Sequence, residues 1–426
     1  MGNSTVRAVN RLTARWAAAA CDGDGDGDGG TVFTAAGVWP LLAFLAGGAA
    51  GPARAELAEA LGVPAGEAPR AARDLLAALA GVRGLRAATG LWAAADLPLE
   101  RAWTDGVAPD TLGTLTGDRD RDRTMLDAWA AEGTGGLVER MPAALPEGPD
   151  AARLVLASAL ALRLKWLRPF GQTAREVDDG PWAGRSLLML YRSTSLPDRV
   201  RVAHGPGGPV TLFEVVGDTG VDVHLVLGEP DAAPGEVLGT GIEAATRARP
   251  STGASLLPLG NPGPGLSVTM VPALSPAPRL DVETPAFEIR TEHDLLDHAR
   301  LFGLGAACDN GSGHFPGISP EPLAVGSARQ SALARFHATG FEAAAVTAIG
   351  LSVGSPPRFP YRVRRAALAF HRPFGFLAVH RTSRLVLSAG WVTEPVPYLP
   401  PAEEEWEEGE EEEWAPAAAR PARPSR

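Results

Sequence analysis

The pattern of apolar residues changes near Val210, and this change constrains the fold more than any other feature. Earlier segments carry apolar residues three or four positions apart, which is the spacing of an amphipathic helix. After the change, residues 221–227 alternate between apolar side chains and Asp222 or His224, which predicts a strand after a turn at Gly217–Gly220. Helices first, followed by many strands with helices interspersed, indicate an α+β fold.

Local signals place several elements more closely. Pro52 is a favourable first residue of a helix and Gly62 a favourable end. The predicted helices are Ser4–Ala20, the apolar part of Val32–Ala50 after a short strand, Pro52–Gly62 and Ala68–Val82. The alternating charges of Asp118–Arg123 predict a solvated loop. Ala366–Val392 is interpreted as two strands joined by a turn at Thr382-Ser383.

The net charge of −11 is concentrated at the C-terminus. Between Val396 and Arg426 there are nine Glu and three Arg. This composition cannot bury enough apolar surface to fold, so we predict a disordered Glu-rich tail over residues 396–426. The rest of the chain is mildly acidic and lacks the concentrated basic face that nucleic acid requires, so we expect no nucleic-acid partner.

Neither an export signal nor a membrane anchor is apparent. The first twenty residues lack the apolar core of roughly 7 to 15 residues that a signal peptide carries, and no apolar run reaches the roughly 18 residues that span a bilayer. Cys21 and Cys308 lie far apart and match no metal or redox spacing. We therefore expect a cytoplasmic protein with no membrane partner, no metal and no cofactor.

Gly350–Gly354 matches the G-x-S-x-G pattern of a nucleophile elbow, but the rest of the sequence does not support a hydrolase. In such hydrolases an acid and then a histidine follow the nucleophile in chain order. Here the last histidine is His380, whereas the first carboxylate after Ser352 is Glu394. The prolines of Ser355-Pro356-Pro357 also prevent the helix that must follow an elbow. We expect a protein that is not an enzyme.

Four segments follow one another in an order that is typical of one family. They are Trp129–Val138, Leu154–Phe170 with its Lys165-Trp166 pair, Ala338–Ile349 and Phe370–Pro395. Together they resemble the serpins, a family of serine protease inhibitors. The first resembles the helix that lies across the main serpin sheet, the second the central strand whose tryptophan (Trp166) lies where that sheet opens, and the third the hinge of the reactive loop.

The resemblance implies a single serpin-like domain over residues 1–395, although the length alone favours two or three domains. Its fold would be α+β, with a large central β-sheet, further sheets, several helices and an exposed reactive loop. We interpret the single lysine against 38 arginines as high-GC coding, and we expect a bacterial member of the family.

The function that the resemblance implies is inhibition of a serine protease by a suicide substrate. The protease cleaves the loop near residues 340–360 and forms an acyl-enzyme, and the loop then inserts into the main sheet as a new strand. The partner is a serine protease in a covalent complex, and we expect the inhibitor to be a monomer. Because many relatives work outside cells, an extracellular location is the alternative to the cytoplasm.

The hinge suits a segment that must change from a loop to a central strand. Small side chains can slip between two paired strands, and a glycine can supply the pivot. The residues that the resemblance assigns to the hinge are Gly340, Phe341, Glu342, Ala343, Ala344, Ala345, Val346 and Thr347.

The position of the reactive bond is open between two sites. Counting the usual loop length from Gly340 places the bond at Gly354–Ser355, which suits a protease that accepts small residues. The alternative is Arg358–Phe359, a trypsin-type site, although an arginine after Pro356-Pro357 is also an ordinary solvated side chain.

Two departures from the family pattern motivate an alternative function. Phe341 stands where serpins usually carry Thr or Ser, so a large ring must find room in the sheet or slow insertion. The positions that match a buried polar cluster of the family are Ala35, Val38, Ser158 and Gln330, so that only Ser158 and Gln330 can still pair. The alternative is a non-inhibitory serpin-fold protein that acts in binding or as a scaffold.

Overall fold

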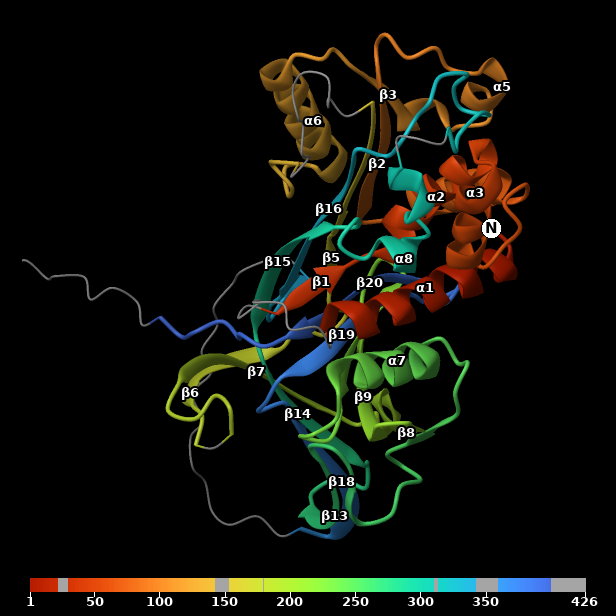
Figure 1. The fold of residues 1–426 in the computed structure, drawn as a ribbon. Helices are drawn as coiled ribbons and strands as arrows, with labels where there is room; N and C mark the ends of the chain where they lie inside the picture. The colour runs from red at the N-terminus through yellow and green to blue at the C-terminus, as the bar shows by residue number, and fades with distance from the viewer. Residues whose placement is uncertain (22–29, 142–152, 179, 310–312, 342–358, 400–426) are drawn as a thin grey trace, which may run out of the picture.

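The computed structural model describes residues 1–21, 30–141, 153–178, 180–309, 313–341 and 359–399. It confirms the α+β architecture, with most helices in the first third of the chain and most strands in the remainder (Figure 1). The helices include α1 (Asn3–Cys21), α2 (Ala35–Gly48), α3 (Gly51–Leu61), α4 (Ala68–Ala80), α5 (Arg101–Thr104), α6 (Arg119–Thr134), α7 (Pro234–Ala245) and α8 (Ala299–Phe302). None of these described helices is long and apolar enough to cross a bilayer.

The first four helices lie within one or two residues of their predicted bounds, because their end signals act locally. The side chain of Thr34 caps α2 by accepting a hydrogen bond from the N–H of Gly37. Gly62 ends α3 in the left-handed conformation, with φ at 65° and its N–H donating to Ala58 O and Glu59 O.

The prediction of a solvated loop at Asp118–Arg123 is wrong, because these residues begin α6. Asp118 caps the helix by accepting hydrogen bonds from the backbone N–H groups of Asp120 and Arg121, each at 3.1 Å. Asp122 is only 3% exposed. Its carboxylate accepts hydrogen bonds from the N–H and hydroxyl of Thr116, each at 2.8 Å, and from the N–H of Gly117 at 3.0 Å. The negative charges therefore serve a helix N-terminus rather than a solvated loop.

The strands form three large sheets and one short pair. The seven-stranded sheet has the order β1 (Thr31–Phe33), β20 (Val386–Val392), β19 (Phe374–His380), β10 (Val221–Leu227), β9 (Gly208–Val216), β8 (Val200–Gly205) and β11 (Ser251–Gly253). The six-stranded sheet has the order β12 (Gly260–Gly263), β13 (Leu266–Ala273), β18 (Tyr361–Ala369), β14 (Arg279–Pro285), β7 (Ser186–Thr194) and β6 (Gly171–Glu176). The five-stranded sheet has the order β15 (Phe287–Asp294), β16 (Ser327–Phe336), β4 (Leu154–Leu162), β2 (Leu85–Ala94) and β3 (Leu112–Leu115). The short pair is β17 (Gly340–Phe341) with β5 (Leu164–Lys165).

Strand β10 confirms the strand predicted from its alternating pattern, but its polar residues are not solvated. All seven of its residues are buried. Asp222 is 1% exposed, and its carboxylate accepts two hydrogen bonds from the guanidinium of Arg381, at 2.6 and 2.8 Å. The alternation therefore reports a strand with a paired buried charge and not a face that is open to water.

The C-terminal strands differ slightly from prediction. The two strands expected in Ala366–Val392 are β19 and β20, whereas Ala366–Ala369 belongs to β18. Strand β18 lies between two partners in the six-stranded sheet. It pairs with β13 in antiparallel fashion from Tyr361 to Leu368 and with β14 in parallel fashion from Arg365 to Ala369.

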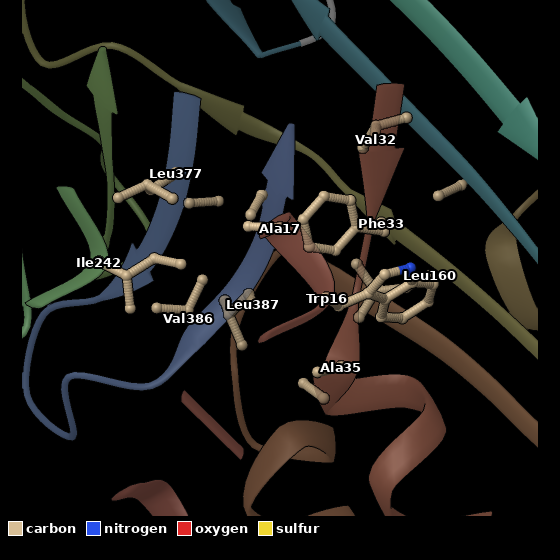
Figure 2. Packing of buried hydrophobic residues seen from close by; sticks show 14 of the residues in the cluster. Trp16, Ala17, Val32, Phe33, Ala35, Leu160, Ile242, Leu377, Val386 and Leu387 are labelled. Carbon is tan, nitrogen blue, oxygen red and sulfur yellow. The ribbon is translucent and has the colours of Figure 1, made fainter. Parts of the chain in front are cut away.

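One large cluster of buried side chains extends from Val6 in α1 to Val392 in β20 and joins the sheets. Figure 2 shows Trp16 of α1 beside Phe33 of β1, with a distance of 5.0 Å between the ring centroids. Ile242 of α7 and Leu377 of β19 lie in the same cluster. Because α1 packs against both β20 and α7, described segments from early and late in the chain contribute to one core.

The paired backbone extends past the predicted start of the tail. Val396 N–H donates to Ala286 O at 2.9 Å, and Tyr398 N–H donates to Ser186 O at 2.9 Å. Composition cannot reveal this pairing, because its partners lie in the chain more than a hundred residues earlier. Residues 400–426 of the Glu-rich tail lie outside the described residues.

The buried contacts of Asp122 generate a stability prediction. Asp122→Ala removes the acceptor of three hydrogen bonds, which come from the N–H and the hydroxyl of Thr116 and from the N–H of Gly117. We therefore expect a loss of about 2 kcal/mol in the free energy of unfolding. Asp120→Ala, at an exposed neighbour in the same helical turn, should cost about 0.5 kcal/mol. Urea unfolding of both variants measures the difference. Equal losses would show that Asp122 acts only through helix-terminal charge.

Candidate functional site

The central strand β4 has two different neighbours in the five-stranded sheet. It pairs with β2 in antiparallel fashion along its whole length. On its other side it pairs with β16 in parallel fashion, but only from Ser327 opposite Val155 to Ala332 opposite Leu160. Residues 333–336 of β16 continue to pair with β15 and have no partner on β4. The two central strands therefore separate at one end of the sheet.

The short strand β17 lies at this opening, close to the end of β16. It pairs in antiparallel fashion with β5, which continues the line of β4, and places Gly340 opposite Lys165 and Phe341 opposite Leu164. The chain reverses between β16 and β17 through a turn in which His337 N–H donates to Gly340 O at 3.0 Å. A Cβ atom at Gly340 would lie 2.4 Å from Leu164 O, so this close approach of two backbones requires glycine.

Trp166 holds the turn that leads into β17. Its indole Nε1–H donates to His337 O at 2.8 Å, and its backbone N–H donates to Thr339 O at 3.1 Å. The Trp166 ring is 4% exposed and lies 4.9 Å, between centroids, from the ring of Phe336 at the end of β16. The family resemblance placed Trp166 where the sheet opens. In the structure its hydrogen bonds go to His337 and Thr339, in the turn just before the predicted hinge.

The titratable side chain of the turn between β16 and β17 is that of His337. Burial lowers the pKa of His337, and the charge of Arg335 lowers it further against the opposing effect of Glu288. The imidazole is therefore neutral near pH 7, and the opening carries no buried positive charge at this position.

The ring of Phe341 has found room in the structure. Phe341 is 2% exposed, and its ring centroid lies 6.3 Å from that of Phe376 in β19. The ring thus belongs to the main core while the residues that follow it leave the described part of the chain. The ring points into the core and already occupies its place there in this structure. No sequence signal could have shown this, because Phe376 comes from a strand of a different sheet.

Ser158 and Gln330 lie opposite each other on β4 and β16, but they do not form the expected pair. The Gln330 side chain instead accepts a hydrogen bond from Thr34 N–H at 2.8 Å and donates one to Thr34 O at 2.9 Å. The hydroxyl of Ser158 is fully buried and has no hydrogen-bond partner among the described residues. Ala35 and Val38 are buried beside them without polar atoms in their side chains.

Thr34 is the residue of this cluster that the sequence analysis missed. It precedes the apolar helix α2, so its role as a helix cap was readable from its position. Its backbone also binds the side chain of Gln330. Because these two residues are 296 positions apart, no local sequence signal could indicate this contact.

The remaining predicted site residues lie mostly outside the described residues. These are Glu342, Ala343, Ala344, Ala345, Val346 and Thr347 of the hinge, and Gly354, Ser355 and Arg358 of the two candidate bonds. The chain is described again from Phe359, which is 51% exposed and lies two residues before the start of β18. The described chain thus ends at β17, in the short pair beside the five-stranded sheet, and resumes just before β18 of the six-stranded sheet (Figure 1). No three His, Cys, Asp or Glu side chains of the described residues gather as a metal site.

Several solved structures share this fold. Human thyroxine-binding globulin in complex with thyroxine is 16% identical, with a TM-score of 0.65 over 92% of this chain and 98% of that chain. A serpin from the trematode Schistosoma haematobium is 15% identical, with a TM-score of 0.65 over 92% and 100%. Serpin48 from the insect Tenebrio molitor is 18% identical, with a TM-score of 0.64 over 92% and 98%. At these identities the likeness shows the fold alone.

Sequence comparison assigns the family. Residues 8–179 and 269–395 match the family described as Serpin (serine protease inhibitor), whose general kind of activity is inhibition of proteases. No curated protein is similar enough to this sequence to match it. The matched segments contain β4, β5, Trp166, β16 and β17, which are the elements that surround the opening in the five-stranded sheet. The chain belongs to the serpin family.

Proposed function

We propose that this serpin inhibits a serine protease as a suicide substrate, through cleavage of the segment after Phe341 and its insertion into the five-stranded sheet. The observation that carries the proposal is the pairing of Gly340 and Phe341 with β5. These two residues occupy the first two positions of an additional strand, in the opening between β4 and β16 and antiparallel to β4. The protease serine would attack a bond farther along the segment and form an ester, and insertion would move the protease before water hydrolyses that ester.

The pairing on β5 fixes the register of the strand that would follow. If the strand that begins with β17 continued along β4 in this register, the small hinge residues would lie opposite residues of β4. The resulting pairs are Ala343–Leu162, Ala345–Leu160, Thr347–Ser158 and Leu351–Leu154. In this register Thr347 would bring a hydroxyl beside the Ser158 hydroxyl, which has no partner in the present structure.

Burial along β4 supports the same register. The side chains of Leu156, Leu160 and Leu162 belong to the main core, whereas Val155 and Ala157 belong to a second cluster beneath α6. Because Phe341 faces the main core, Ala343, Ala345 and Thr347 would face it too. The small size of these residues is what a strand entering between two packed strands needs.

Insertion would also improve the hydrogen bonding of the sheet. β4 and β16 now form a parallel pair over six residue positions only. A strand between them would be antiparallel to both, and antiparallel pairing is slightly more stable per residue. The inserted backbone would find partners on both sides, so cleavage would release free energy.

The length of β4 is compatible with both candidate bonds, and Gly354–Ser355 lies closer to the end of the strand that would insert. The first residue of β4, Leu154, would pair with Leu351, so cleavage at any later bond leaves enough chain for complete insertion. Gly354–Ser355 leaves three residues beyond that pair, and Arg358–Phe359 leaves seven. We propose Gly354–Ser355 as the reactive bond and Arg358–Phe359 as its alternative.

One observation favours a second candidate function, a non-inhibitory binding or scaffold protein. Gln330 is engaged with Thr34, and the Ser158 hydroxyl is buried without a partner, so the polar contacts beneath the opening are incomplete. A protein of the same fold is named for binding thyroxine. A protein of this second kind would be cut in the loop without trapping the protease.

The first prediction of the proposal is a covalent adduct. Mixing the full chain with elastase-, subtilisin- and trypsin-like enzymes should give, with at least one of them, an SDS-stable band of the combined mass. Ala345→Glu would place a carboxylate against Leu160 in the core during insertion, so this variant should be cut without an adduct. Ala345→Ser keeps a small side chain and should still form it. Cleavage by all three enzymes without any adduct would favour the non-inhibitory alternative.

The second prediction concerns stability after cleavage. A nick normally lowers the thermal midpoint because it adds chain entropy to the unfolded state. Here a cut between Leu351 and Arg358 should instead raise the midpoint by at least about ten degrees, since a complete central strand is gained. Calorimetry of intact and nicked protein measures it. A midpoint that falls or stays constant would exclude insertion of the loop.

The third prediction tests the seated ring of Phe341. Phe341→Thr removes a buried ring, and we expect a loss of about 2 to 3 kcal/mol in the free energy of unfolding. Phe359→Thr, at the exposed far end of the segment, should cost much less. Because the ring is already in its pocket, Phe341→Thr should not reduce the number of inhibitor molecules consumed per protease silenced. A clear fall in that number would show that entry of the ring limits insertion.

A further inference from the structure

A hollow lies away from the hinge, between the C-terminal end of α7, strands β8 to β10 and the turn that joins β19 to β20. Figure 1 shows α7 beside α1 and over β8 and β9, in line with their contacts. The hollow has a volume of about 660 Å³, within the roughly 300 to 1,000 Å³ that small-molecule sites span. Its arginines are Arg199, Arg201, Arg247, Arg249 and Arg384, and its carboxylates are those of Asp198 and Glu214. Its walls are therefore positive on a chain whose net charge is −11.

Two of these arginines have a backbone conformation that arginine rarely adopts. Arg247 has φ at 65° and Arg384 has φ at 62°, and they are the only residues other than glycine with positive φ in the described part of the chain. Left-handed backbone is unfavourable for a residue with a Cβ atom, and glycine or asparagine is usual at such turns. Both exceptions to this rule line the same hollow.

The local structure explains how the two backbones are held but not why they carry arginine. Arg247 follows the end of α7, where the helix carbonyls attract a positive side chain. Arg249 already provides one there, since its guanidinium binds Glu243 at 2.6 Å. Arg384 is held by Asn10, whose Nδ2–H donates to Arg384 O at 2.8 Å. Glycine would satisfy both turns, so the arginine side chains have a use of their own.

Neither guanidinium is neutralised within the described structure. Arg247 and Arg384 have no ion-pair or side-chain hydrogen-bond partner among the described residues. The nearby carboxylate of Glu214 is bound by Arg199. Burial and then the charge of Arg247 lower the pKa of Arg384, against the opposing effects of the carboxylates of Glu214 and Asp222.

His224 adds a polar atom without a partner. It projects from β10, is 7% exposed and lines the hollow. Its Nε2 atom has no hydrogen-bond partner among the described residues. Burial lowers the pKa of His224, so the ring is neutral and can donate or accept one hydrogen bond there. A buried polar atom without a partner is costly, and a bound molecule that reaches it would remove that cost.

We propose that this hollow binds a small anion that carries at least two phosphate or carboxylate groups. These groups would meet the guanidinium groups of Arg247 and Arg384, whose paired N–H donors match such oxygens. A further polar atom of the ligand would reach His224, and Leu212 and Ala244 would contact its carbon atoms. Apart from Arg384, all of these residues lie between 180 and 268, which the family match leaves out. The site is independent of the proposed inhibitory loop.

Titration calorimetry on the full chain at constant ionic strength tests the proposal, with pyrophosphate and citrate as probes. At least one probe should bind at a single site, and its identity separates a phosphate ligand from a carboxylate ligand. Arg247→Gly and Arg384→Gly should each weaken this binding by about tenfold or more. Because glycine suits both backbones, the two variants should unfold at or above the wild-type temperature, which separates lost binding from lost folding.

Arg70→Gln is the matched control, since it removes one positive charge from an exposed position of α4 outside the hollow. It should bind the probe as the wild type does. The proposal is overturned if neither probe binds the wild type at millimolar concentration, or if the two glycine variants keep wild-type affinity. Equal weakening by Arg70→Gln would also overturn it, because the binding would then depend only on net charge.

Discussion

The burial of both faces of β4 is the constraint on which the rest of the structure depends. All nine of its residues are buried. Alternate side chains enter the main core beside α2 and the separate cluster beneath α6, so the five-stranded sheet must carry helices on both faces. A strand of this kind tolerates no water on either side and can change only at its edges. Its edge toward β16 is the incomplete one.

That edge connects the fold with the proposed function. The antiparallel edge toward β2 is paired from end to end, whereas the parallel edge toward β16 is paired over six positions and then diverges. β17 fills the first two positions of the divergence, and Trp166 holds the turn above it. The sheet is thus covered by helices on both faces and partly open along one line. The described chain enters that line at β17 and is described again at Phe359, ahead of β18 in the six-stranded sheet. The family membership and the geometry of this edge both support the proposed insertion of a strand.

The sequence predicted those parts whose signals are local. Helix ends marked by Pro52 and Gly62 and the alternation in β10 depend on neighbours a few residues away, whereas the expected place of Trp166 came from the family resemblance. The parts that it could not predict depend on contacts between distant segments. Gln330 meets Thr34 rather than Ser158, the ring of Phe341 lies near Phe376, and Val396 and Tyr398 pair with strands formed much earlier in the chain. Asp118–Arg123 was misassigned for a different reason, because alternating charge describes both a solvated loop and a capped helix start with one buried carboxylate.

The position of β18 has a mechanical consequence. The strand that follows the loop is held on both sides, by eight residue pairs to β13 and five to β14. A pull along its axis loads these hydrogen bonds in shear, so that many must break together, whereas a strand peeled from a free edge loses them one at a time. The described residues that flank the segment 342–358 are thus held differently: two residues pair with β5 on one side, and a strand paired along both edges follows on the other. In the proposed mechanism, β18 would limit how far the hinge can move as long as the segment is intact, and a single cut would remove that limit without disturbing either sheet.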